Sequence, residues 1–168
     1  MSKGLPRSLA HASPAVGAIR KSTFPIKAIA LSVAGAAGIG FGSVVIGDFP
    51  EGNVLLHGAV GYVKLSTVDI DVITAFSGNY SVGSSPTTDN TLSGSEIDIL
   101  PSAAINAAVS GVSALTRNVN ATAVLLDNTD GSLELNLNVL IADASISGIG
   151  DFIVNGFVTV LYTMMGDD

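Results

Sequence analysis

The most regular pattern in the chain is a strict alternation of apolar and polar positions between residues 132 and 141. Every second position is apolar, and the positions between them are polar as far as Asn138: Leu133, Leu135, Leu137, Val139 and Ile141 alternate with Ser132, Glu134, Asn136 and Asn138. Successive side chains of a β-strand point to opposite faces. The pattern therefore predicts a strand with one buried face and one solvent-facing face.

Two further segments show the same period. Residues 68–76 alternate, although Ile73 makes their outer face partly apolar. Residues 152–163 are rich in β-branched and aromatic side chains, with Val154, Val158, Val160 and Tyr162 on one face and Asn155, Thr159 and Thr163 on the other. Gly156 lies inside this second segment, and a glycine within a strand is typical of a bulge. Both segments are predicted strands.

Weaker strand patterns occur at residues 26–33, 39–47, 54–65, 96–100 and 121–126, which brings the predicted total to about eight strands. Turn-forming residues separate them at positions 48–52, 83–94 and 127–131. Residues 102–115 fit either a short helix or an irregular crossing. Many short strands with no convincing long helix predict an all-β antiparallel sandwich or barrel, and a jelly-roll sandwich is the favoured form.

Charge divides the chain into two parts. All fourteen acidic residues lie at or after Asp48, whereas five of the seven basic residues lie in the first 27 positions: Lys3, Arg7, Arg20, Lys21 and Lys27. The first part is also rich in Pro, Ser, Ala and Gly, a composition that buries too little apolar surface to fold alone. We therefore predict an extended basic N-terminal arm, residues 1–27, followed by a single β-sandwich domain, residues 28–168.

The charge distribution also indicates the kind of partner. Five basic residues spread over 27 positions are sparse for nucleic-acid binding, and an acidic body would repel a duplex. The arm, with its bases Lys3, Arg7, Arg20, Lys21 and Lys27, is better suited to an acidic protein surface. Residues 28–46 are uncharged and follow Lys27, as in a membrane span. Their many glycines and serines argue against that reading.

Only 12% of the residues are charged, against about 25% in an average soluble domain. So thinly charged a surface predicts that much of it is covered by other subunits. The outward-facing apolar positions Ile73, Phe157 and Leu161 are predicted oligomer contacts, because exposed apolar patches usually mark interfaces.

Candidate catalytic and metal-binding residues are few. The chain has no cysteine and only two histidines, His11 and His57, which is too few for a histidine- or thiolate-based metal centre. His57 is expected to be partly buried or at an interface. We predict no catalytic residue, no metal ion and no cofactor, and therefore a protein that is not an enzyme.

Two carboxylate groupings leave alternatives open. Glu96 and Asp98 are two residues apart on a predicted strand and would share a face, as the paired carboxylates of a glycosidase do. Solvent-facing acids that keep a strand soluble are much commoner. The turn from Asp127 to Glu134 carries three acids and could hold a calcium ion, although a hairpin turn with Gly131 at positive φ explains the same residues.

Three segments and the chain end resemble a known family of proteins. Residues 47–59, 82–102 and 127–138, with the final Gly166, Asp167 and Asp168, are similar to decoration, or cement, proteins of tailed bacteriophages, notably marine and cyanobacterial ones. The resemblance covers roughly residues 40–168 and leaves the arm outside. It implies a β-rich body, often a homotrimer, that lies on the outer surface of the virion head and binds the major capsid protein.

Two other functions fit parts of this pattern. A trimeric tail-fibre or receptor-binding module is also β-rich and poor in charge. A polysaccharide-degrading enzyme would use Glu96 and Asp98 as its carboxylate pair. The sequence favours the structural virion protein over both.

Overall fold

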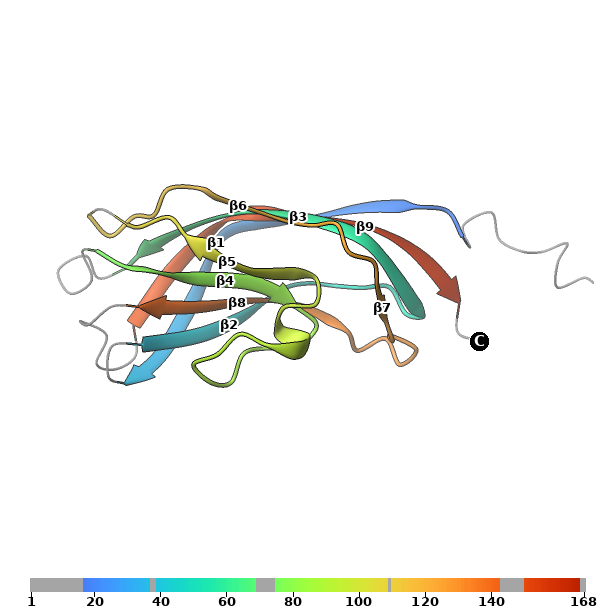
Figure 1. Cartoon of the computed structure of the whole chain (residues 1–168), viewed down its shortest axis with the longest axis horizontal. Coiled ribbons are helices and arrows are strands. Elements are labelled where there is room, and N and C mark those ends of the chain that lie inside the picture. The colour runs from blue at the N-terminus through green and yellow to red at the C-terminus, as the bar shows by residue number, and fades with distance from the viewer. Residues whose placement is uncertain (1–16, 37–38, 69–74, 109, 143–149, 167–168) are drawn as a thin grey trace, which may run out of the picture.

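The computed structural model describes residues 17–36, 39–68, 75–108, 110–142 and 150–166 (Figure 1). These residues form nine strands and one short 3-10 helix, η1 (Gly94–Glu96), and contain no α-helix. The strands are β1 (Arg20–Ala36), β2 (Ile39–Asp48), β3 (Asn53–Thr67), β4 (Ser77–Gly83), β5 (Leu100–Ile105), β6 (Thr116–Asn120), β7 (Val124–Leu126), β8 (Glu134–Ala142) and β9 (Gly150–Gly166).

The strand pairs are nested like those of one long hairpin. β1 pairs with β9, β2 with β8, β3 with β6 and β4 with β5, all antiparallel. Rolled up, this hairpin gives two layers, sheet A (β1-β9-β3-β6) and sheet B (β2-β8-β4-β5), which form the upper and lower layers in Figure 1. This is the arrangement of a jelly roll, so the predicted fold class is confirmed.

One strand belongs to both layers. Residues 20–33 of β1 pair with β9 in sheet A, and Ala34 to Ala36 pair with β2 in sheet B. The opposite edge is closed by side chains, because Asn118 Nδ2 on β6 donates to Pro101 O at 2.6 Å and Asn120 Nδ2 donates to Ile99 O at 3.0 Å. The short strand β7 extends the sheet A edge beside the start of β3.

The core lies between the two inner faces. On β9 the even-numbered residues from Phe152 to Met164 point inward, and on β8 the inward residues Leu135, Leu137, Val139 and Ile141 are fully buried. Tyr80 crosses this core from β4, and its hydroxyl donates to Gly61 O on β3 and Thr116 O on β6. The alternation predicted for β8 and β9 is therefore confirmed on the inner face.

The outer face of β8 differs from the prediction. Asn136 and Asn138 were expected to face solvent, but both are buried. The β4–β5 connection covers Asn138, since Asn138 Nδ2 donates to Ser85 O and Glu96 O, and its Oδ1 accepts from Thr87 N. Asn136 Nδ2 donates to Glu134 O on its own strand. Asparagine suits this position because it can satisfy both donors and acceptors of a covering loop.

The predicted boundary between arm and body at residue 27 also changes. Residues 20–27 lie in β1, and Arg20 to Ile26 pair directly with β9. Ile26 is buried in the core. The folded body therefore includes residues 20–27, because the side chains of this segment complete sheet A.

A bulge occurs beside Gly156, as its position predicted. Ile26 pairs with Gly156 and Ile29 with Val154, so Lys27 and Ala28 of β1 stand against the single residue Asn155 of β9. Ala28 has φ 50° and its N–H donates to Asn155 Oδ1 at 3.0 Å. The extra residue is thus on β1.

Other predicted elements changed in extent. The predicted strand at 96–100 is wrong: Glu96 ends η1, and β5 begins only at Leu100. Of residues 102–115, the first four belong to β5 and the described remainder is an irregular crossing. The predicted strand at 68–76 lies mostly outside the described residues. No helix in the described part is long and apolar enough to span a membrane.

Candidate interaction surface

The outer face of sheet A carries several large apolar side chains in contact with solvent. On β9, Phe157 and Leu161 are 38% and 43% exposed, and on the neighbouring edge Val119 and Leu125 are 47% and 65% exposed. Tyr62 of β3 lies opposite Phe157, with ring centroids 5.0 Å apart. We call this outer surface, formed by the outward residues of β1, β9, β3, β6 and β7, the apolar face.

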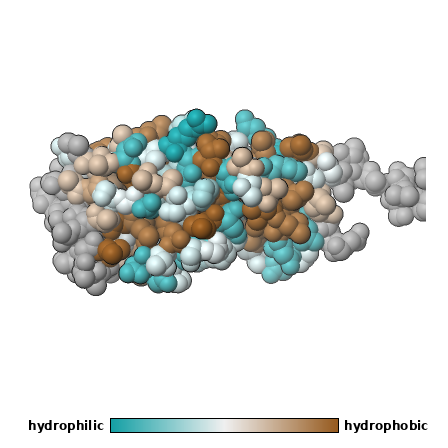
Figure 2. Space-filling model, in the orientation of Figure 1, coloured by the Kyte–Doolittle hydropathy of each residue, from teal (hydrophilic) through white to brown (hydrophobic). Residues whose placement is uncertain are grey.

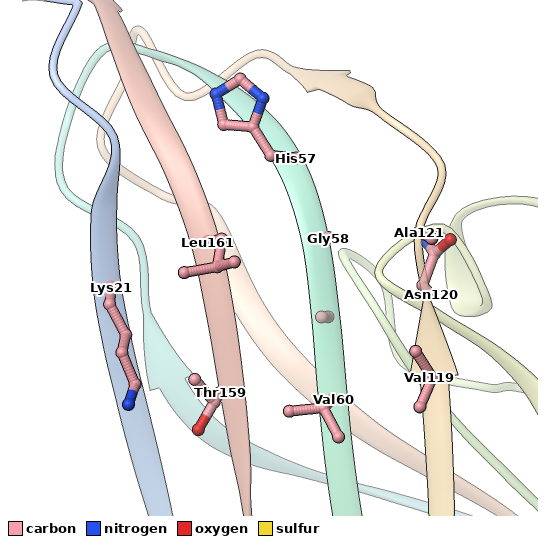
Figure 3. Close-up of a pocket in the computed structure, with 10 residues that line it drawn as sticks. Lys21, His57, Gly58, Val60, Val119, Asn120, Ala121, Thr159 and Leu161 are labelled. Carbon is pink, nitrogen blue, oxygen red and sulfur yellow. The ribbon is translucent and has the colours of Figure 1, made fainter.

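A groove of about 490 Å³ crosses the apolar face (Figure 3). Thr159, Val60 and Val119 are in register on β9, β3 and β6 and line it side by side. Leu161 and Lys21 line its other part. The groove is therefore a mostly apolar depression with one lysine at its side.

The groove has a bulge in β3 at one end. Leu56 pairs with Tyr162 and Gly58 with Leu161, so His57 is the extra residue. Its Nε2 lies 2.8 Å from Thr163 Oγ1, which ties the imidazole to β9. A Cβ at Gly58 would lie 2.9 Å from Asn120 O, so a glycine permits the close approach of the segment after β6.

The charged side chains that the structure describes on the apolar face are all basic. Lys21, Lys64 and Arg117 lie at outward positions of β1, β3 and β6, and each is exposed. None of them forms an ion pair with a described acidic side chain. No acidic side chain described in the structure lies on this face, so its described charged side chains are positive in a chain whose net charge is −7.

Exposed acids gather instead on two turns at one end of the sandwich. The β2–β3 turn and the β7–β8 turn together carry Asp48, Glu51, Asp127, Asp130 and Glu134, which we call the acidic end. Buried Asn128 joins the turns: its Nδ2 donates to Phe49 O and Pro50 O, and its Oδ1 accepts from Leu133 N. The acidic end is therefore a fixed surface.

The apolar groups are not confined to sheet A. On the side of the molecule turned toward the viewer in Figure 2, apolar and hydrophilic groups alternate in separate patches. Ile39 and Val45 of β2 are each 41% exposed. The apolar face differs from these scattered groups because it is a contiguous surface with a groove.

The predicted contact residues fall into three groups. Lys3 and Arg7 of the arm and the predicted oligomer contact Ile73 lie outside the described residues. Lys21 lies on the apolar face and Lys27 is exposed at the β1 bulge, whereas Arg20 points toward the inner side and is half-buried. Phe157 and Leu161 are exposed on the apolar face. The structure thus brings Lys21, Phe157 and Leu161 onto one surface.

The carboxylates considered for catalysis are engaged in local hydrogen bonds. Glu96 Oε2 accepts from Ser93 N in the capping box of η1, and the Asp98 carboxylate accepts from Ser84 N and Ser84 Oγ. Burial raises the pKa of the Asp98 carboxyl above its ordinary value, against the opposing effect of these bonds. Glu96 and Asp98 do not share a strand face as predicted, because the chain turns at Ile97.

The acids considered for calcium binding also have local roles. Asp127 Oδ1 accepts from Thr129 N and Oγ1, and Asp130 Oδ1 accepts from Ser132 N and Oγ. These bonds hold the pKa of Asp130 below its ordinary value. Gly131 has φ 69°, as predicted for a hairpin turn. No group of three metal-binding side chains was found among the described residues.

Comparison with known proteins gives few matches. No family model and no curated protein matches the sequence. The chain is similar to the crystal structure of the infectious bursal disease virus VP2 subviral particle, with a TM-score of 0.42, 11% identity, and coverage of 90% of this chain and 34% of that one. It is also similar to the structure of the infectious bursal disease virus Gx strain, with a TM-score of 0.38, 14% identity, and coverage of 88% and 33%. This chain spans about a third of the length of each of them.

Proposed function

We propose that this protein is a non-enzymatic structural component of a virus particle, a capsid decoration protein. It binds the outside of a tailed-phage head and clamps adjacent capsomers of the major capsid protein. The observation that carries this proposal is the apolar face, a contiguous surface of exposed apolar and basic side chains on a rigid jelly roll. Surfaces of this kind usually mark protein interfaces.

The segments that resemble phage decoration proteins support the proposal, because they form one continuous part of the molecule. Asn128 joins residues 47–59 to residues 127–138 through the two turns of the acidic end. Asn138 joins residues 82–102 to the same strand, β8. The resemblance therefore follows a structural unit rather than three unrelated stretches.

The proposed mechanism is stabilisation by binding. A protein that binds only the assembled lattice stabilises that lattice by mass action. The basic arm lies across capsid-protein surfaces, and its residues Lys3 and Arg7 contact acidic groups there. The jelly-roll body is displayed above the lattice, and Phe157 and Leu161 lie in contacts between copies of a homotrimer.

A reconstitution experiment tests this function. Heads that lack the protein are incubated with the purified full chain or with a chain that lacks residues 1–16, and bound copies and the temperature of DNA release are measured. The full chain should bind in a saturable manner and raise the release temperature, whereas the shortened chain should bind at least about tenfold more weakly because it lacks arm charges. Failure of the full chain to bind heads would contradict the proposal.

A further inference from the structure

We propose that the apolar face of one copy of the chain binds the acidic end of a second copy. This inference deepens the proposed homotrimer by assigning its two contact surfaces. The two surfaces lie on different parts of the same molecule. They differ in charge, since the apolar face carries Lys21, Lys64 and Arg117, and the acidic end carries five exposed carboxylates.

Charge decides against the simplest alternative, in which two copies meet through the same face. That contact would bring together two surfaces whose described charged side chains are all basic, and like charges placed close together across an interface cost several kcal/mol. Contact between the apolar face and the acidic end brings opposite charges together instead. A second copy is thus the partner whose complementary charge is already present in the chain.

The acidic end contains a pair of like charges whose repulsion a basic partner would reduce. Asp48 and Glu134 are directly opposite each other on β2 and β8, and like charges at such a pair are destabilising. Glu51 lies against the β7–β8 turn of the same end, with its Cβ and Cγ 3.6 Å from the ideal Cβ position at Gly131. Cations from a neighbouring copy would offset this repulsion.

Shape agrees with the same pairing. Pro50, between Phe49 and Glu51, is exposed on the β2–β3 turn and gives the acidic end an apolar group. The groove of the apolar face is lined by Val60, Val119 and Leu161, with Lys21 beside them. An apolar turn flanked by carboxylates fits an apolar groove flanked by a lysine.

The symmetry of the assembly follows from this pairing. A contact between two different surfaces is heterologous, and such contacts close into rings when the rotation between copies allows it. A ring of three copies is the assembly expected here. Every copy then uses its apolar face once and its acidic end once.

The first test places an acid on the apolar face. Leu161→Glu should weaken self-association by about 100-fold or more, because the new carboxylate would face the carboxylates of the acidic end and would compete with them for Lys21, the residue opposite it on β1. Ile39→Glu is the matched control, since Ile39 is 41% exposed at the start of β2 in sheet B, outside the apolar face and at the opposite end of β2 from Asp48. Oligomeric state is measured by analytical ultracentrifugation, and folding by circular dichroism.

The second test removes charge from the acidic end without disturbing its turns. The triple variant Glu51→Gln, Asp127→Asn, Asp130→Asn keeps every Oδ1 acceptor and should be monomeric where the natural chain is a trimer. Asp89→Asn is the matched control, because Asp89 Oδ1 makes the same kind of turn with Thr91 N and Oγ1 outside the acidic end.

Mixing the two variants gives the decisive result. Leu161→Glu retains a working acidic end and the triple variant retains a working apolar face, so a mixture should form 1:1 dimers and grow no further. A natural chain that stays monomeric, a natural symmetric dimer, or a mixture without 1:1 dimers would overturn the proposal. These measurements use no phage heads, so they test self-association separately from head binding. If the natural chain is a monomer that still binds heads, this inference fails and the proposed function stands.

Discussion

Tyr80 is the clearest example of how a single residue links the two layers. Its ring is fully buried, and burial raises the pKa of its hydroxyl above its ordinary value. The hydroxyl satisfies carbonyl oxygens of both β3 and β6 from a position on β4. A residue of sheet B thereby completes hydrogen bonding in sheet A.

Tyr80→Phe should lower the free energy of unfolding by about 1–2 kcal/mol, because the one hydroxyl hydrogen that Gly61 O and Thr116 O share is lost in the core. Tyr62→Phe is the control, since Tyr62 lies on the outer face and its hydroxyl makes no hydrogen bond with a described residue. Urea denaturation of both variants measures the difference. Equal losses in the two variants would contradict the role given to Tyr80.

Asp98 gives a prediction about pH. Burial raises the pKa of its carboxyl in the folded state, so the folded chain holds this proton more tightly than the unfolded chain. Its contribution to stability is greatest below pH ~4 and is lost as pH rises through the raised pKa. The unfolding free energy of the natural chain should therefore fall, relative to that of Asp98→Asn, as pH rises from about 4.

Asp89 provides a control of opposite sign. Hydrogen bonds from Thr91 hold the pKa of its carboxyl below the ordinary value, so its contribution is present above the unfolded pKa and lost as pH falls. Urea denaturation across pH, with Asp98→Asn and Asp89→Asn compared to the natural chain, measures both. The difference in unfolding free energy between the natural chain and each variant should change with pH in opposite directions for Asp98→Asn and Asp89→Asn. A change in the same direction would contradict the pKa shifts given to the two carboxyl groups.

At the scale of elements, Asn128 fixes the relation between two hairpin turns. It is fully buried and makes three side-chain hydrogen bonds to the β2–β3 turn and to Leu133. Asn128→Ala should lower the unfolding free energy by about 2–4 kcal/mol, since one buried and two partly buried backbone groups lose their partners. Asn90→Ala, an exposed asparagine in the β4–β5 connection, should change it by less than about 0.5 kcal/mol. Similar values for the two variants would rule out this role.

The first strand gives a second prediction at this scale. Removal of residues 1–16 leaves β1 complete, so the cooperative unfolding transition should be preserved. Removal of residues 1–27 deletes the pairs from Arg20 to Ile26 and exposes the β9 backbone and core residues beneath them. The longer deletion should therefore abolish cooperative thermal unfolding. An equally stable longer deletion would show that residues 20–27 are part of the arm after all.

The strands that could be predicted from sequence are those in which apolar residues alternate with polar ones because only one face of the strand is buried. β8 and β9 are long, and their inner faces follow strict alternation. Asn136 and Asn138 misled the prediction because polarity was equated with exposure, and a covering loop makes buried asparagines favourable. β6 was missed because its inward residues Thr116 and Asn118 are polar, and their hydrogen bonds across the β5–β6 edge depend on the folded topology.

On the apolar face, the sequence identified only those exposed apolar residues that lie on a strand predicted from its alternation. Phe157 and Leu161 stood out as apolar residues at outward positions of β9. Val119 and Leu125 lie on β6 and β7, which are too short to show a period. Their place on the same face follows from pairing with β3, which local sequence does not encode.

At the scale of the whole molecule, positive and negative charges are separated both along the sequence and across the folded surface. The sequence separates a basic start from an acidic remainder, and the structure separates the basic apolar face from the acidic end within the folded body. Such a distribution suits a protein that contacts its own copies and a larger lattice. It gives electrostatic complementarity without a net positive charge.

The central claim is that the protein is a structural component on the outside of a phage head. Its copy number and position in purified particles, measured by quantitative mass spectrometry and electron microscopy, test this claim most directly. The account predicts copies in proportion to the major capsid protein, arranged as trimers over the outer head surface. A few copies at the tail, or none in the particle, would contradict it.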